Sequence, residues 1–273
     1  SALGLGMTPA GARVPPDRSI LRGFRPPADP SKSPMTRHDG RAPGEMRTLR
    51  FERGFTNTAP GSVLACFGET RVLCTATYTD GVPSFLQGKG RGWMTAEYSM
   101  LPSSTNTRKS RDRAGRVDGR SVEIQRLIGR SLRAVMDFKQ MSERTIWIDC
   151  DALQADGGTR TTAISGAYVA LYDALTAMDE KRQLRKWPLN SKLAAVSVGV
   201  VGGNPMVDLN YKEDSKAGSD MNLVMTGESQ FVEVQGAAEG APFSRDELNT
   251  LLDMGEDSIR RIFELQEEAL KAS

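Results

Sequence analysis

The alternation of hydrophobic and polar residues predicts a series of β-strands. Ile146 and Ile148 alternate with Trp147 and Asp149, and this period of two is typical of a half-buried strand over 145–153. Two apolar runs around Gly68-Glu-Thr70 predict a hairpin. Further strand-like runs lie at 46–56, 62–67, 71–75, 93–101, 193–201, 206–211, 221–225 and 231–235.

Three segments carry hydrophobic residues at helical spacing. Between 121 and 138, apolar side chains recur on one stripe, and arginines occupy the opposite face. A second segment follows Arg160, and a third opens at Ser244-Arg-Asp-Glu247, a capping-box pattern. The order of strand groups and helices, without a fixed-period repeat, predicts an α+β fold with mixed sheets and packed helices.

Residues 1–34 differ from the rest of the chain. They contain seven prolines and no sustained hydrophobic periodicity, so we expect a flexible N-terminal extension or expression remnant outside the fold. Met35 is a candidate for the original start. Residues 35–273 are expected to form a single domain.

The charge distribution favours a polyanionic partner. The 273-residue chain carries a net charge of only +2, but residues 108–133 contain nine lysines or arginines against three acidic residues. This local excess favours nucleic acid binding. The alternative is that some of these arginines form only the solvated face of the helix that follows.

Several classes of protein are disfavoured by composition. The three cysteines lack the spacing of a zinc site or a disulfide framework, and no apolar run reaches the 18 residues of a membrane-spanning helix. A cytoplasmic location is therefore expected, without a membrane partner. Only one histidine, His38, is present, next to the extension. Catalysis is expected to use carboxylates, a metal or a nucleophilic substrate rather than a Ser-His-Asp triad.

The segment Gly157-Gly-Thr-Arg160 lies between a predicted strand and a predicted helix. Two glycines allow the backbone to approach a ligand, and the helix start leaves N–H groups unpaired, an arrangement that favours an anion. Arg160 adds a permanent cation, and Thr159 and Thr161 add hydroxyl donors, so phosphate is the natural ligand. The alternative is a plain helix cap with an exposed arginine.

Two aspartates, Asp214 and Asp220, flank a short polar segment that we expect to be a loop between adjacent strands. Such a loop can bring both carboxylates to one rim, where they would suit Mg²⁺. Glu213 is a less certain third ligand. The alternative is an ordinary polar turn.

Taken together, these segments resemble RNase PH, the bacterial phosphorolytic exoribonuclease family. The resemblance runs from about Met35 to the last helix and is carried by several stretches in the expected order. These are Phe67-Gly-Glu-Thr70, Gly92-Trp-Met-Thr-Ala-Glu-Tyr98, Gly119-Arg-Ser-Val-Glu-Ile-Gln-Arg-Leu127, Leu153-Gln-Ala-Asp-Gly-Gly-Thr-Arg160, Glu213-Asp-Ser215 with Asp220-Met-Asn222, and Val234-Gln-Gly236 with Ala238-Glu-Gly240.

The resemblance implies roles for particular residues. Arg120, Gly158, Thr159 and Arg160 would hold the attacking phosphate, while Asp214 and Asp220 would be catalytic or metal-binding carboxylates. Arg108 and Arg111 match RNA-binding positions, whereas Ser103 stands where the family usually has arginine. The implied fold is like the second domain of ribosomal protein S5, and the implied assembly is a homohexameric ring.

The implied activity is phosphate-dependent 3′–5′ exoribonuclease (tRNA nucleotidyltransferase) activity. It trims tRNA precursors with 3′ extensions and other RNA, including rRNA, and releases nucleoside diphosphates, with inorganic phosphate as co-substrate and Mg²⁺ as cofactor. Phosphate is already anionic and nucleophilic, so positioning and charge neutralisation would be the main tasks of the protein. Two rivals are a catalytically inactive RNA-binding ring subunit of the same fold and a hydrolytic metal-dependent nuclease.

Overall fold

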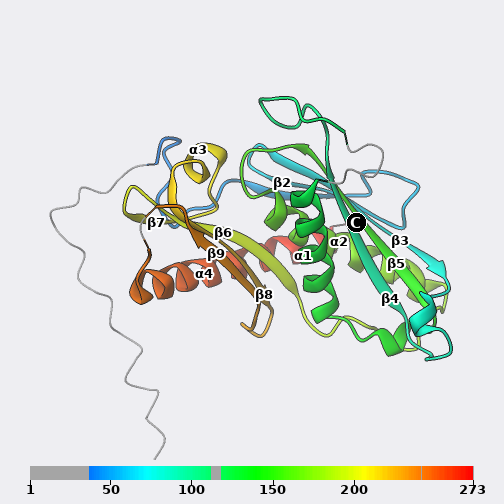
Figure 1. Cartoon of the computed structure of the whole chain (residues 1–273). Helices are drawn as coiled ribbons and strands as arrows, with labels where there is room; N and C mark the ends of the chain where they lie inside the picture. The colour runs from blue at the N-terminus through cyan, green and yellow to red at the C-terminus, as the bar shows by residue number, and fades with distance from the viewer. Residues whose placement is uncertain (1–36, 112–117, 241, 273) are drawn as a thin grey trace, which may run out of the picture. The chain divides into compact units, whose positions relative to one another are not determined.

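The computed structural model describes residues 37–111, 118–240 and 242–272 (Figure 1). Residues Thr36–Ser273 form one compact unit. The N-terminal extension expected at 1–34 lies outside the described residues, as do residues 112–117 in the predicted basic loop. The flexibility of the N-terminal extension therefore stays a prediction. The expectation of a single domain over 35–273 also stays a prediction.

The first sheet contains five strands in the order β1-β2-β3-β5-β4. They are β1 (Leu49–Arg53), β2 (Gly61–Phe67), β3 (Thr70–Asp80), β4 (Trp93–Met100) and β5 (Arg144–Gln154). The pairing of Phe67 with Thr70 confirms the predicted hairpin, and β4 runs parallel to β5 while the other pairs are antiparallel. The sheet is therefore mixed.

The second sheet contains four antiparallel strands in the order β7-β6-β8-β9. They are β6 (Leu193–Val201), β7 (Asn204–Val207), β8 (Ala217–Thr226) and β9 (Phe231–Ala238). Strand β6 is buried at every position from Leu193 to Gly199, as expected when both faces of a strand are covered. Helices α2 (Thr159–Glu180) and α4 (Arg245–Lys271) both pack against β6.

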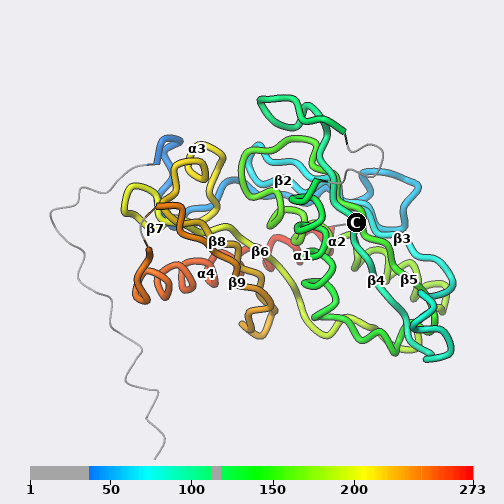
Figure 2. The backbone as a smooth tube through the Cα atoms, viewed as in Figure 1, coloured from blue at the N-terminus to red at the C-terminus, as the bar shows by residue number. Residues whose placement is uncertain are grey.

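Helix α2 connects the two sheets. It contacts β2 and β3 on one side and β6 on the other, and Figures 1 and 2 show it between the two sheets. A helix enclosed in this way must be apolar around most of its circumference, as this sequence is. Helix α1 (Gly119–Ala134) covers β4 and touches α2. The α+β class with mixed sheets and packed helices is thus confirmed.

The structure corrects two boundaries. The helix predicted at 121–138 ends at Ala134, and a short 3₁₀ helix, η3, follows at Phe138–Met141. The strand predicted at 206–211 ends at Val207, because Asp208 has a positive φ of 50° that no strand can continue through.

Residues Tyr211–Asp214 form a short helix, α3, where we expected a loop. The side chain of Asn210 accepts from the N–H of Glu213, and the side chain of Glu213 accepts from the N–H of Asn210. This capping box nucleates the turn, and the sequence prediction overlooked it. No helix among the described residues has both the length and the apolar character needed to cross a bilayer.

Candidate functional site

The turn between β5 and α2 has the conformation expected for an anion site. Gly157 and Gly158 adopt φ values of +75° and +65°, which other residues rarely tolerate. A Cβ atom at Gly157 would lie 2.4 Å from the carbonyl oxygen of Leu209, so this position also needs glycine for space. The first intrahelical bond runs from the N–H of Thr162 to the oxygen of Gly158. The preceding N–H groups of α2 are consequently available to a ligand.

Arg120 and Arg160 each occupy the second position of a helix, α1 and α2 respectively. Arg120 is exposed, and its guanidinium has no partner among the described residues. Arg160 instead donates to Glu123 at 3.1 Å and to Gln235 at 3.3 Å. An anion bound at the turn would therefore compete with the carboxylate of Glu123 for Arg160, a contact that the sequence did not reveal.

Asp214 ends α3, and Asp220 lies within β8, paired with Gly199 of β6. The expectation that both flank a loop was therefore wrong, although the structure does bring them together. Desolvation raises the pKa of Asp214, and the neighbouring charge of Asp220 raises it further. Solvent reaches Asp214, but surrounding protein atoms crowd it enough to penalise its ionised form.

The cationic and acidic parts of the prediction meet in one place. The guanidinium groups of Arg120 and Arg160 both act to lower the pKa of Asp214, opposing the effects of desolvation and Asp220. The N–H of Tyr211 donates to Asp156 at 3.2 Å, so α3 lies against the turn that precedes α2. Because Coulombic effects fall with distance, the two arginines and the acidic pair belong to one region of the surface. Thr159, buried at the start of α2, completes the set predicted to hold phosphate.

Tyr98 is a site residue that the sequence prediction missed. Its side chain is almost fully buried, with 4% of the residue exposed, and its hydroxyl has no hydrogen-bond partner among the described residues. Burial raises the pKa of Tyr98, while the Thr159 hydroxyl and the charges of Arg120 and Arg160 act in the opposite direction. The Thr159 hydroxyl is thus close but does not satisfy the phenolic oxygen, which stays a buried polar atom without a partner among the described residues, beside the two arginines.

Glu213 does not join the acidic pair. Both of its carboxylate oxygens accept hydrogen bonds from the buried guanidinium of Arg37, at 2.7 and 2.5 Å. Burial would raise the pKa of Glu213, but the bonds from Arg37 and Asn210 outweigh it and lower the pKa. His38 and Asp39 lie close enough to Glu213 to suggest a metal site, yet the adjoining arginines already supply the positive charge. Glu213 is therefore not a third ligand beside Asp214 and Asp220, because Arg37 and Arg41 occupy its carboxylate.

The basic segment is only partly available to a polyanion. Arg108 and Arg111 are exposed and have no partners among the described residues, so both guanidinium groups are accessible to a polyanion. By contrast, Lys109 pairs with Asp118, Arg130 with Glu233, and Arg133 donates to the oxygen of Met94. The alternative that part of this basic cluster does not bind nucleic acid therefore holds for Lys109, Arg130 and Arg133, whose side chains are already paired within the protein.

The fold and site have matches among known proteins. Residues 45–176 match domain 1 of the 3′ exoribonuclease family, RNase PH, and residues 193–258 match domain 2 of that family. The chain belongs to the RNase PH family of 3′ exoribonucleases. The segments that match the two domains of the family both lie within the compact unit formed by Thr36–Ser273.

Similar solved structures include subunits of larger assemblies. A structure of rice (Oryza sativa) Rrp46 is 19% identical, with a TM-score of 0.70, and the match covers 86% of this chain and 100% of that one. An Archaeoglobus fulgidus exosome with RNA bound to the active site is 21% identical, with a TM-score of 0.69 and coverages of 84% and 91%. An archaeal exosome core is 20% identical, with a TM-score of 0.66 and coverages of 85% and 90%. At these identities the likeness shows the fold alone.

Proposed function

We propose that this RNase PH family member is a phosphate-dependent 3′–5′ exoribonuclease that shortens 3′-extended RNA, chiefly tRNA precursors, and releases nucleoside diphosphates. The observation that carries the proposal is the meeting of Arg120, Arg160 and the α2 N-terminus with the acidic pair. Tyr98 adds support, because its unpartnered hydroxyl lies close to Thr159 and is affected by the charges of Arg120 and Arg160. The reaction is reversible nucleotidyl transfer.

In the proposed reaction, an oxygen of inorganic phosphate attacks the last phosphodiester of the RNA. The bond to the 3′ oxygen of the penultimate nucleotide breaks, and that oxygen takes up a proton as the shortened RNA leaves. Arg120, Thr159, Arg160 and the backbone N–H groups hold the attacking anion in line, against the repulsion of the phosphodiester. No strong protein base is needed, in keeping with a chain that has one histidine.

The acidic pair fits Mg²⁺. Two adjacent carboxylates supply the hard oxygen ligands that this ion prefers, and a cation would relieve the mutual repulsion that contributes to the raised pKa of Asp214. When bound, Mg²⁺ would offset negative charge that develops on the transferring phosphate. Asp214 and Asp220 are assigned jointly to metal binding and catalysis, and the carboxyl group that does not hold the ion would donate the proton to the leaving 3′ oxygen.

RNA binding and assembly are part of the same proposal. Arg108 and Arg111 would contact RNA phosphates, and six copies of the chain would form a ring in the cytoplasm. Two of the similar structures are an archaeal exosome core and an Archaeoglobus fulgidus exosome with RNA bound to its active site, which supports RNA as the polymer and a ring as the assembly. The same neighbours favour a second candidate at least equally, a catalytically inactive RNA-binding ring subunit.

One assay separates these possibilities. A tRNA precursor with a 3′ extension and a labelled terminal nucleotide is incubated with the protein and Mg²⁺, with and without inorganic phosphate, and the mononucleotide products are resolved. Phosphorolysis requires phosphate and releases a nucleoside diphosphate. A nucleoside monophosphate formed without phosphate would establish hydrolysis instead, and RNA binding without any product would establish the inactive subunit.

A further inference from the structure

The turn at Gly157-Gly158 is held from behind, on the side away from the proposed phosphate. In a trans peptide the C=O and the following N–H point in opposite directions, so fixing a carbonyl oxygen also aims the next N–H. The oxygen of Asp156 accepts from Arg47 at 2.5 Å, and that of Gly157 accepts from Thr70 at 2.6 Å and from Arg47 at 3.5 Å. The N–H groups of Gly157 and Gly158 are thereby directed away from Arg47 and Thr70.

Arg47 is itself fixed by a buried ion pair. Its side chain is 7% exposed, and its Nε and Nη2 atoms donate to the two carboxylate oxygens of Asp208 at 3.0 and 2.8 Å. Burial would raise the pKa of Asp208, but the hydrogen bonds from Arg47 outweigh it and lower the pKa. One planar guanidinium thus joins Asp208 to two successive carbonyls of the turn, which the single ammonium of lysine cannot do.

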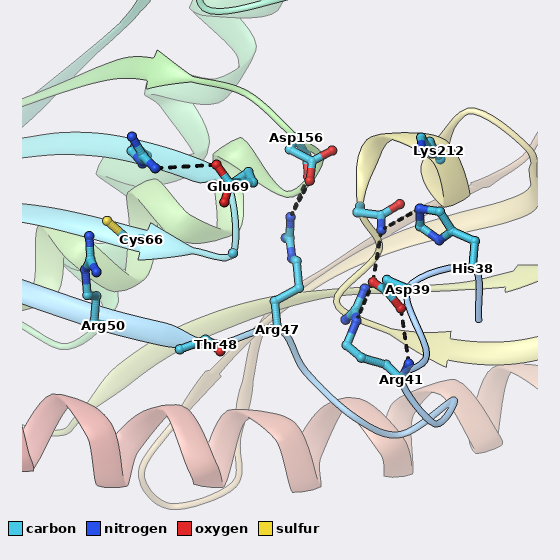
Figure 3. A pocket seen from close by; sticks show the side chains of 13 residues that line it. His38, Asp39, Arg41, Arg47, Thr48, Arg50, Cys66, Glu69, Asp156 and Lys212 are labelled. Atoms are coloured by element: carbon cyan, nitrogen blue, oxygen red, sulfur yellow. Dashed lines mark hydrogen bonds and ion pairs between the residues drawn. The ribbon is translucent and has the colours of Figure 1, made fainter. Parts of the chain in front are cut away.

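Two glycines, Gly68 and Gly158, leave room for the side chain of Arg47. A Cβ atom at Gly68 would lie 2.5 Å from the Cδ atom of Arg47, and one at Gly158 would lie 3.3 Å from its Nη2 atom. Figure 3 shows Arg47 extending to Asp156 among the residues that line a pocket of about 600 Å³, with Arg41 to its right.

Thr70 makes the second support. It is fully buried, and its hydroxyl accepts from the N–H of Asp156 at 2.9 Å while donating to the oxygen of Gly157. The Thr70 hydroxyl therefore links the N–H of Asp156 to the carbonyl oxygen of Gly157. Neither Arg47 nor Thr70 is expected to touch phosphate, since both contact the turn through carbonyls that point away from the N–H groups offered to the anion.

We propose that Arg47 and Thr70 are positioning residues, which set the direction of the backbone N–H groups that bind the attacking phosphate. This inference rests on the proposed phosphorolytic function. It assigns the strength of phosphate binding partly to residues outside the Gly-Gly-Thr-Arg segment. Asp208 supports the same arrangement through Arg47.

The test compares Arg47→Lys with Arg41→Lys in the full chain. Arg41 is a matched control: it is similarly buried and pairs with Asp39, Asp208 and Glu213, but it does not contact the turn. Initial rates across phosphate concentrations at saturating RNA give KM for phosphate and kcat, and thermal melting reports folding. Misplacing a binding group by about 1 Å costs up to about 100-fold, so we expect KM for phosphate to rise about tenfold in Arg47→Lys and less than twofold in Arg41→Lys.

Thr70→Val keeps the test decisive if Arg47→Lys does not fold. It removes one hydroxyl with almost no change of shape, and we expect it to raise KM for phosphate at least threefold while the affinity for RNA stays within twofold of wild type. An unchanged KM in a folded Arg47→Lys or Thr70→Val protein, or an equal rise in Arg41→Lys, would overturn the inference. Absence of phosphate-dependent turnover in the wild type would instead reject the proposed function itself.

Discussion

At the scale of single residues, the arginines near the site divide into two groups. Arg120 and Arg160 begin helices beside the acidic pair, whereas Arg108 and Arg111 are exposed on the segment after β4. We expect Arg160→Lys to raise KM for phosphate by about tenfold, because lysine keeps the charge but loses the bidentate geometry. Arg108→Ala and Arg111→Ala should leave that KM unchanged.

The second group is tested by binding rather than turnover. Affinity for RNA is measured across salt concentrations without phosphate, and Arg108→Ala and Arg111→Ala should each flatten the logarithmic salt dependence by up to about one unit. Arg120→Ala should behave like Arg160→Lys in the kinetic assay. If Arg160→Lys weakened RNA binding but left the phosphate dependence unchanged, the assignment of the Gly-Gly-Thr-Arg turn to phosphate would be wrong.

Tyr98→Phe examines the buried hydroxyl. Its removal leaves no new unsatisfied group, because the hydroxyl has no partner among the described residues, so the melting temperature should stay the same or rise. If the hydroxyl binds phosphate, KM for phosphate should rise about tenfold, the effect of losing one hydrogen bond to a charged group. The control is Tyr168→Phe, because Tyr168 is also a buried tyrosine but lies on α2. An equal change of KM in both variants would show that Tyr98 is not part of the site.

Asp214→Asn should separate activity from stability. A carboxyl group whose pKa is raised on folding stabilises the fold most at low pH, and this contribution is lost as the pH rises through the raised pKa. Removing the charge at pH 7 without Mg²⁺ should therefore raise the melting temperature slightly, because solvent screens the exposed Asp214, while turnover is abolished and RNA binding stays nearly intact. Asp220→Asn should likewise abolish turnover. Retained Mg²⁺-dependent turnover in both variants would contradict the assignment.

At the scale of elements, two buried helix glycines have different roles. A Cβ atom at Gly166 of α2 would lie 2.6 Å from the Cβ of Ala65 and 2.8 Å from the Sγ of Cys74, so the helix packs on the first sheet through this gap. At Gly129 of α1, the nearest atom is the flexible end of Arg133, at 2.8 Å. We expect Gly166→Ala to destabilise the fold by about 1–3 kcal/mol through overpacking.

Gly129→Ala is the matched control for this prediction. Alanine is favoured over glycine within a helix by about 1 kcal/mol, which offsets the movement of Arg133, so stability should change by less than about 1 kcal/mol. Urea unfolding of both variants gives the comparison. A gain of stability in Gly166→Ala would show that α2 and the sheet can separate, and the close contact would then not determine how α2 is placed.

The predictable parts of the site are those that depend on local chain signals. Paired glycines before an apolar helical run predicted the turn at Gly157-Gly158, and the alternation of Ile146 and Ile148 predicted β5, because both patterns act over a few residues. Helix α3 was missed because its signal, Asn210 capping Glu213, is as short as the helix itself. The ion pair between Arg47 and Asp208 was missed for another reason, since 161 residues separate its members and only folding brings them together.

At the scale of the whole molecule, the site is assembled at the junction of the two sheets. The first sheet and its helices supply Tyr98, Arg120 and Arg160, and the second sheet and α3 supply Asp214 and Asp220. Helix α2 packs against both sheets, so it fixes the distance between the proposed phosphate-binding residues and the acidic pair. The arginines proposed to hold phosphate therefore come from the first part of the sequence, and the two aspartates come from the second part.

The outer face of the first sheet carries an exposed aromatic side chain. Trp147 is 40% exposed there, and on the same strand desolvation raises the pKa of Asp149 and of Asp151. Asp149 is also affected by the charges of Glu97 and Asp151. Tryptophan is enriched in protein–protein interfaces, so we place the contact between copies on this face. We therefore expect a homo-oligomer, and the proposed ring requires six copies.

Light scattering coupled to gel filtration should give about six times the chain mass of 29.7 kDa. Trp147→Glu, which places a further negative charge beside Asp149 and Asp151, should shift the protein to smaller species, whereas the exposed Trp187→Glu should not. Turnover of long RNA should fall with the loss of assembly, because a ring brings the basic segments of several copies to one RNA. A monomer with full activity on long RNA would contradict the ring, and an intact Trp147→Glu hexamer would place the interface on another face.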